Sequence, residues 1–161
     1  MADVLYIVIP CFNEEEVLTE TTKRLTEKLH KMVDYGLIAD SSRIMYVDDG
    51  STDNTWRIID KQYKSNEYVT GIKLSRNKGH QNALIAGLFE AAEHADMVVS
   101  MDSDLQDDIE VLDQFINAYY DGKEIVYGVR KSRKKDSIFK RTTAIIFYKL
   151  MRAMGVEIVY N

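Results

Sequence analysis

The sequence of 161 residues lacks several features that mark well-known classes of protein. It has one cysteine, Cys11, so it forms no intramolecular disulfide, and a reducing compartment suits it best. It has no apolar run of about 18 residues, the length typical of a transmembrane helix. No basic stretch precedes the first apolar run, which differs from a signal peptide. It also lacks G-x-x-x-x-G-K-[S/T] and G-x-G-x-x-G segments, which weakens phosphate-loop and dinucleotide-binding interpretations.

Charge is distributed unevenly along the chain. The net charge is −5, with 45% hydrophobic and 29% charged residues, an ordinary balance for a globular domain. Residues 130–161 hold nine Lys and Arg against two acidic residues, a balance of +7, which leaves −12 for residues 1–129. An acidic body with a basic segment predicts an anionic partner for that segment, either a membrane surface or a nucleic acid.

Strand-like and helical patterns alternate along the chain. Apolar runs of strand length occur at residues 4–9, 43–47, 68–74, 96–101 and 125–127. Helical patterns occur at residues 14–33, 51–63, 80–91 and 108–120. This alternation predicts one α/β domain with a mostly parallel sheet flanked by helices. Polar clusters follow the first, second and fourth runs, and ligands bind at the carboxyl ends of strands in such sheets.

The strongest candidate for chemistry is the segment M-D-S-D-L-Q-D at residues 101–107. Asp102 and Asp104 are two apart at a strand end, so an extended backbone places both carboxylates on one face. Oxygen ligands without a Cys or His cluster favour a hard cation, Mg²⁺ or Mn²⁺. A solvated turn or a helix cap is the plainer interpretation, but the alignment with two other polar strand ends favours a site.

Two further polar segments follow strand-like runs. In residues 47–54, a turn and a helix cap account for Ser51 or Thr52 but not for the adjacent carboxylates Asp48 and Asp49. An aspartate at this place can accept hydrogen bonds from a base or a ribose.

In residues 10–14, Pro10 is expected to end the strand, which leaves Phe12 and Asn13 to line a pocket. Cys11 is expected to be a buried hydrophobe and not a nucleophile, since no histidine is placed to activate it.

Basic residues lie near two of the predicted strand ends. Arg76, Lys78 and His80 precede one predicted helix, and Arg130 follows the last strand-like run. Either group could contact a diphosphate, and simple solvation at the surface is the alternative.

Together these segments resemble family 2 glycosyltransferases of the GT-A fold. The resemblance rests on P-C-F-N-E-E, V-D-D-G-S-T-D-N-T, L-S-R-N-K-G-H-Q-N-A-L, M-D-S-D-L-Q-D and Y-G-V-R, in that order, and extends from about residue 4 to residue 155. The most similar branch is the polyprenyl-phosphate glycosyltransferases, with bactoprenol glucosyltransferases and dolichol-phosphate mannose synthase. Members often read D-L-Q-D-P-P-E where this chain has Asp108 and Ile109, which alters the start of the next helix.

The resemblance implies roles for individual residues. The residues implied to contact the nucleotide sugar are Pro10, Phe12, Glu14, Val47, Asp49, Arg76, Asp102, Ser103, Asp104 and Arg130. Those implied in catalysis are Asp102, Asp104 and Arg130. Asp102 and Asp104 would bind the metal together with Gln106. Val47 and Asp49 would hold the base and ribose, and Arg130 would contact the phosphates of the donor.

The implied reaction is a metal-dependent, inverting transfer of a hexose from a nucleoside-diphosphate sugar to a polyprenyl phosphate of the cell envelope. UDP-glucose is expected before GDP-mannose as donor, and Mg²⁺ or Mn²⁺ as cofactor. The expected location is the cytoplasmic face of the membrane. No nucleic acid partner is expected, and a homo-oligomer is possible.

The C-terminal residues support a lipid partner. In residues 137–154, helical spacing gathers on one side Phe139, Ile146, Phe147, Leu150 and Met154. The opposite side gathers Arg141, Lys149 and Arg152. A basic amphipathic helix favours an anionic membrane surface, and a helix packed on the sheet with its charges in water is the alternative.

These patterns predict a catalytic domain at residues 1–130 and a basic segment with an interfacial helix at residues 131–161. In the branch that the sequence resembles, the chain continues past the position of Asn161, in many members with transmembrane helices. We therefore expect this chain to be a truncated form, soluble or peripheral, of a membrane-anchored protein.

Two other interpretations stay open. A soluble family 2 transferase acting on a polysaccharide or another glycan would use the same donor site. A receiver-like signalling module that binds Mg²⁺ is also α/β, but its acidic pair follows the first strand. Here residues 10–13 follow the first strand-like run, and Asp48 and Asp49 follow the second.

Overall fold

A computed structural model describes residues 2–104 and 108–128 of the chain, which divides into two compact units, residues 1–124 and 125–161. Of the second unit, only residues 125–128 are described. In the first unit, strands alternate with helices as the sequence predicts. The elements in chain order are β1 (Leu5–Cys11), α1 (Leu18–Asp34), β2 (Arg43–Asp48), α2 (Thr55–Ser65), β3 (Val69–Lys73), α3 (His80–Ala92), β4 (Met97–Ser100), the 3₁₀ helix η1 (Ile109–Val111) and α4 (Leu112–Tyr120).

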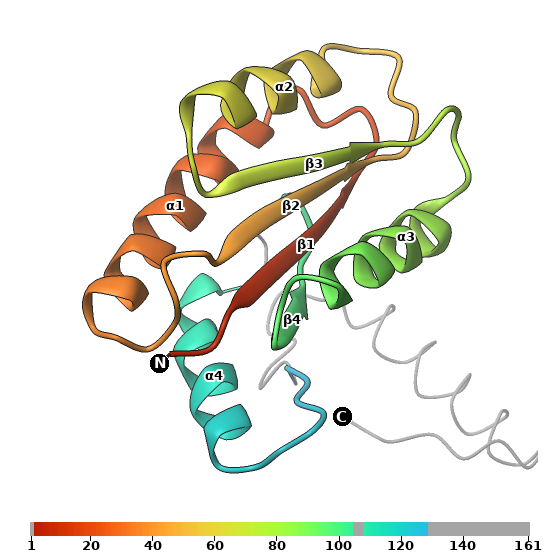
Figure 1. Cartoon of the computed structure of the whole chain (residues 1–161). Coiled ribbons are helices and arrows are strands. Elements are labelled where there is room, and N and C mark those ends of the chain that lie inside the picture. Colours follow the sequence, from red (N-terminus) through yellow and green to blue (C-terminus); the bar gives the residue numbers. More distant parts are fainter. Residues whose placement is uncertain (1, 105–107, 129–161) are drawn as a thin grey trace, which may run out of the picture. The chain divides into compact units, whose positions relative to one another are not determined.

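The four strands form one parallel sheet in the order β3-β2-β1-β4 (Figure 1). β1 lies inside the sheet, where Ile7 pairs with Ile44 of β2 and with Val99 of β4. A parallel sheet has both faces covered, and its strands are correspondingly apolar. The expected α/β architecture with a mostly parallel sheet is confirmed.

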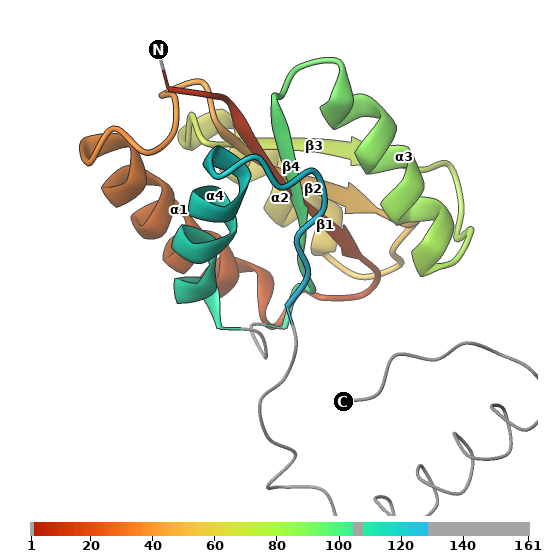
Figure 2. The same cartoon turned by 90° about the horizontal axis from the view of Figure 1, so that it is seen from below.

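Helices cover the two faces of this sheet unequally. Residues of α1, α2 and α4 pack with one face of β1 and β2 in a large core, which includes Ile7, Leu25 and Leu112. On the other face, α3 is the one helix of the described residues that packs there, in a smaller core around Val8 and Val47. Figure 2 shows α3 across the sheet from α1 and α4. Because β1 faces a helical layer on each side, its sequence is a continuous apolar run.

Contrary to the expectation, Pro10 does not end β1, which extends to Cys11. The Val8 carbonyl accepts a hydrogen bond from the Met101 N–H at 3.1 Å, and the Cys11 carbonyl accepts one from the Asp49 N–H at 2.8 Å. Successive residues of a strand bond to opposite sides, so Pro10 faces the β4 side. Its pairing with β4 has already stopped there, so the missing N–H of Pro10 removes no bond from the ladder.

Two helices begin later than their sequence patterns predict. α1 begins at Leu18, because residues 15–17 form a turn in which the Glu14 carbonyl accepts from the N–H groups of Val17 and Leu18. α2 begins at Thr55, so neither Ser51 nor Thr52 caps it. Their polar groups bond instead to the loop after β1.

A third expectation, a strand at residues 125–127, is wrong. Residues 125–128 belong to no strand in the structure. An apolar run of three residues becomes a strand only when a neighbour supplies the hydrogen-bond ladder, which the pattern by itself cannot guarantee. The amphipathic helix predicted at residues 137–154 lies outside the described residues. Among those that are described, no helix combines the length and the apolar character needed to cross a membrane.

We predict that Gly87→Ala destabilises the first unit, although alanine favours helix. A Cβ on Gly87 would lie 2.5 Å from Val8 Cγ1 and 2.7 Å from Val47 Cγ2, so α3 would have to move from the sheet. Overpacking should lower the free energy of unfolding by about 1–3 kcal/mol, which should outweigh the gain of about 1 kcal/mol from the higher helix propensity of alanine. Urea unfolding measures the change. The control is Phe89→Ala on the same helix, where the side chain is 73% exposed and the change should stay within about 0.5 kcal/mol. A more stable Gly87→Ala variant would contradict the close packing.

Candidate functional site

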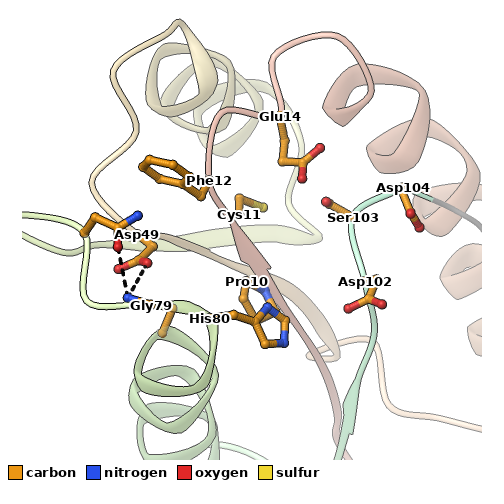
Figure 3. A pocket seen from close by; sticks show the side chains of 12 residues that line it. Pro10, Cys11, Phe12, Glu14, Asp49, Gly79, His80, Asp102, Ser103 and Asp104 are labelled. Carbon is orange, nitrogen blue, oxygen red and sulfur yellow. Dashed lines mark hydrogen bonds between the residues drawn. The ribbon is translucent and has the colours of Figure 1, made fainter.

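A pocket of about 280 Å³ opens where β1 and β4 end (Figure 3). Asp102, Ser103 and Asp104 lie on one side of it, and Asp49 and Gly79 lie on the opposite side. A smaller hollow of about 220 Å³ shares Pro10, His80 and Asp102 with it. The pocket thus lies at the carboxyl ends of parallel strands, the place where ligands bind in this kind of sheet.

The structure brings most of the predicted site residues together. Those that line the pocket are Pro10, Phe12, Glu14, Asp49, Asp102, Ser103 and Asp104. Val47 is fully buried beneath α3, and Arg76 is exposed outside the lining. Gln106 and Arg130 lie outside the described residues. The roles assigned to all these residues stay predictions.

Five further residues line the pocket beyond the set that the family resemblance implies. They are Cys11, Asn77, Gly79, His80 and Ala83. Four of them surround the start of α3, where Gly79 has a φ of 88°. The N-K-G turn before a helix is the sequence signal for this wall, and of the five residues the sequence singles out only His80, as a possible contact for a diphosphate.

Cys11 is buried, as expected. Burial raises the pKa of its thiol well above the usual value, and the nearby carboxylates of Glu14 and Asp48 raise it further. Its Sγ donates to the Ile9 carbonyl at 3.4 Å. Cys11 therefore contributes an uncharged wall to the pocket.

Asp49 joins two turns at one side of the pocket. Its Oδ1 accepts from the Lys78 N–H at 2.6 Å. Its Oδ2 accepts from the Gly79 N–H at 2.8 Å (Figure 3). The carboxylate thereby fixes the backbone just before α3. The turns touch closely, since a Cβ on Gly50 would lie 2.5 Å from the Arg76 carbonyl carbon.

Asp48 has a separate structural role. It is fully buried, and its Oδ1 accepts from the Ser51 N–H at 3.2 Å, which closes the turn after β2. The two adjacent carboxylates, which a simple turn and cap left unexplained, therefore both accept from backbone N–H groups, Asp48 from one and Asp49 from two.

The loop after β1 is tied to the turn after β2. Asn13, with a φ of 57°, donates its N–H to Ser51 Oγ and accepts from the Thr52 N–H, both at 2.9 Å. The Glu14 N–H donates to Thr55 Oγ1 at 2.8 Å. These bonds hold Phe12, which is 43% exposed, at the rim of the pocket.

The lining of the pocket is acidic. It includes the carboxyl groups of Glu14, Asp49, Asp102 and Asp104, against one histidine, His80. Asp102 and Asp104 are both exposed and lie in the same pocket, as their spacing predicts. Within residues 2–104 and 108–128, no group of three or more His, Cys, Asp and Glu side chains is placed to hold a metal. Two carboxylates still suit Mg²⁺ or Mn²⁺, which typically binds through one or two carboxylates and substrate phosphates.

Comparison with known proteins identifies the family. The sequence model of glycosyl transferase family 2 matches residues 6–158. The chain belongs to glycosyl transferase family 2. Its relatives include "Uncharacterized glycosyltransferase YkoT" of Bacillus subtilis (strain 168), which is 54% identical over 158 residues, 98% of this chain and 47% of the relative. The "Bactoprenol glucosyl transferase" of Shigella phage SfV is 37% identical over 144 residues, 89% of this chain and 44% of the relative.

This family 2 chain therefore spans less than half the length of these curated relatives. Among solved structures, S. aureus TarS 1–349 in complex with UDP superposes with a TM-score of 0.54 at 22% identity, over 83% of this chain and 40% of TarS. A likeness at this identity concerns the fold, and it confirms the expected GT-A-type α/β architecture.

We predict that Asp49→Asn destabilises the family 2 domain by about 1–3 kcal/mol, because an amide NH₂ would oppose a backbone N–H in a site that is 2% exposed. Hydrogen exchange at the Lys78 and Gly79 amides should become faster. Asp121→Asn, on an exposed residue, is the matched control and should stay within about 0.5 kcal/mol. Unchanged protection of both amides in Asp49→Asn would show that Asp49 does not fix this turn.

Proposed function

We propose that this chain carries the donor site of a metal-dependent, inverting glycosyltransferase that moves a sugar from a nucleoside-diphosphate sugar to a polyprenyl phosphate. The observation that carries the proposal is the convergence of Asp102 and Asp104 with Asp49 and Phe12 in one pocket at the strand ends. Relatives named bactoprenol glucosyl transferase support a polyprenyl phosphate acceptor and glucose as the sugar. UDP-glucose is the first candidate donor and GDP-mannose the second.

The acidic lining supports a role for a cation. A diphosphate is repelled by the carboxylates of Glu14, Asp102 and Asp104 unless positive charge is placed between them. Asp102 and Asp104 would hold Mg²⁺ or Mn²⁺, with Gln106 as a further ligand from the sequence. A divalent ion there would neutralise the charge that develops on the diphosphate leaving group.

The chain's own residues would orient the donor around this point. Phe12 and Asp49 lie away from Asp102, with Pro10 between, and we assign the base and ribose to these three residues. Each carboxylate oxygen of Asp49 accepts one backbone N–H, which leaves a lone pair on each for a ligand. Arg130, by the sequence motif, would contact the phosphates.

The proposed acceptor explains why the mechanism requires no dedicated base. A phosphate monoester carries about −1.5 to −2 charge at neutral pH, so its oxygen attacks without first losing a proton. A single displacement at the anomeric carbon forms the bond to the lipid phosphate, breaks the bond to the diphosphate and inverts the configuration. The residues of the pocket then need only position the donor and stabilise the leaving group.

Calorimetry of nucleotide binding tests the donor site. Binding of UDP and of GDP should be tighter with Mn²⁺ than without it, and Asp102→Asn or Asp104→Asn should weaken the Mn²⁺-dependent binding by about tenfold or more, equivalent to about 1.4 kcal/mol. Asp121→Asn removes the same charge from an exposed residue outside the pocket and should bind like wild type. Equal affinities for all variants, with and without metal, would contradict the proposed donor site.

Vesicle sedimentation tests the lipid partner. Replacing Arg133, Lys134 and Lys135 with Gln should weaken binding to anionic vesicles at least about tenfold, since each basic residue near the surface contributes about 1 kcal/mol, and high salt should do the same. The matched control replaces Lys23, Lys31 and Lys61, three exposed lysines of the first unit, and should bind as wild type does. Absent or salt-independent binding would defeat the membrane role and favour a glycan acceptor.

A further inference from the structure

One buried side of α1 contacts the segment that carries the two pocket aspartates. Thr21, Leu25 and Lys28 are spaced by four and three residues, so they lie on the same side of the helix. All three are buried. Thr21 contacts the segment just after β4, and Lys28 contacts η1 and α4 beyond it.

Thr21 is bonded to the residue between the two aspartates. Its Oγ1 lies 2.6 Å from the carbonyl oxygen of Ser103, 82 residues away in the sequence, and 3.1 Å from that of Val17. A hydroxyl has one hydrogen to donate, and the shorter distance places it toward Ser103. Thr21 is fully buried, so water does not replace this donor.

Because Ser103 lies between Asp102 and Asp104 in the chain, a bond that fixes its backbone also restricts the backbone of both aspartates. The side chain of Ser103 is 5% exposed, whereas Asp102 and Asp104 on either side are exposed and line the pocket. The ladder between β4 and β1 ends with the bond from the Met101 N–H to the Val8 carbonyl. Past that point, the Thr21 hydroxyl ties this segment to a different element of the fold.

Lys28 is bonded to η1 and α4, which follow the aspartates in the chain. Its Nζ donates to Glu110 Oε2 and to Asp113 Oδ2, both at 2.7 Å, and its side chain is 6% exposed. Burial lowers the pKa of the ammonium, but the hydrogen bonds to Asp113 and Glu110 outweigh burial and raise it overall. Lys28 therefore stays charged at neutral pH, and α1 is bonded both to Ser103, between the aspartates, and to two acidic residues that follow them in the chain.

We propose that Thr21 is a positioning residue for the metal-binding carboxylates. By holding the Ser103 carbonyl, it fixes the direction in which Asp102 and Asp104 project into the pocket, and it touches neither substrate nor metal itself. This inference rests on the proposed function for the metal, but the placement of the loop can be measured without it.

The neighbouring threonine provides a matched control. Thr22 is 1% exposed, and its Oγ1 donates to the Leu18 carbonyl and bonds to Tyr46 Oη at 2.9 Å, within the core. Thr21→Val and Thr22→Val therefore make the same chemical change at adjacent buried positions, and only the first touches the loop. Thr21→Ser keeps the hydroxyl and should restore wild-type behaviour. If Thr21→Val does not fold, Thr21→Ala and Thr22→Ala give the same comparison.

Two measurements on the full chain decide the question. Thr21→Val should weaken Mn²⁺-dependent binding of UDP or GDP by about tenfold, the loss expected for one buried hydrogen bond, and leave metal-free binding unchanged. It should also speed hydrogen exchange at the amides of residues 101–104 in the absence of metal and nucleotide. Thr22→Val should lower the melting temperature comparably and change neither property.

The outcomes separate this inference from the proposed function. If exchange at residues 101–104 is the same in Thr21→Val and Thr22→Val, Thr21 does not position the loop. If the wild type shows no Mn²⁺-dependent binding, the proposed function fails, and the metal part of the inference fails with it. Faster exchange confined to Thr21→Val, with Thr21→Ser restored, supports the positioning role.

Discussion

The pocket depends on the point at which β1 stops pairing with β4. Up to Val8 the two strands share a hydrogen-bond ladder, and at Pro10 the chain has no N–H to continue it. β1 still pairs with β2 as far as Cys11, so the loops after these two strands stay together. The residues after β4 instead turn toward α1. The space between the two sets of loops is the pocket.

Hydrogen bonds between loops then give the pocket its walls. Asp49 holds the turn before α3, and Asn13 holds the loop after β1 to the turn after β2. On the other wall, Thr21 holds Ser103. Each bond joins segments far apart in the sequence and uses a backbone group that lies outside regular secondary structure. In these loops, short polar side chains pair with backbone groups that, in the sheet, would pair with a neighbouring strand.

The sequence predicts the sheet well, because apolar runs such as residues 4–9 report burial on both faces directly. It also places Asp102 and Asp104 at a strand end. Prediction from the sequence fails where a polar residue has two possible hydrogen-bond partners. Ser51 matches a helix cap in the local pattern, but the structure uses it for the Asn13 N–H. Asp49 matches a ligand contact, but it also bonds the Lys78 and Gly79 amides, about thirty residues away, which no local pattern reveals.

The two acceptors near the Thr21 hydroxyl bear on how freely the aspartate loop can move. When the loop is in place, the hydrogen points to Ser103, and the Val17 carbonyl lies 3.1 Å away. If the loop moved outward, rotation about the Cβ–Oγ1 bond of Thr21 would turn the hydroxyl hydrogen to the Val17 carbonyl. The buried donor would then keep an acceptor. The Ser103 carbonyl would meanwhile move toward water and find a new donor there. Displacement of the loop would therefore cost the bond that directs Asp102 and Asp104, but it would leave the Thr21 hydroxyl paired, so α1 need not loosen with it.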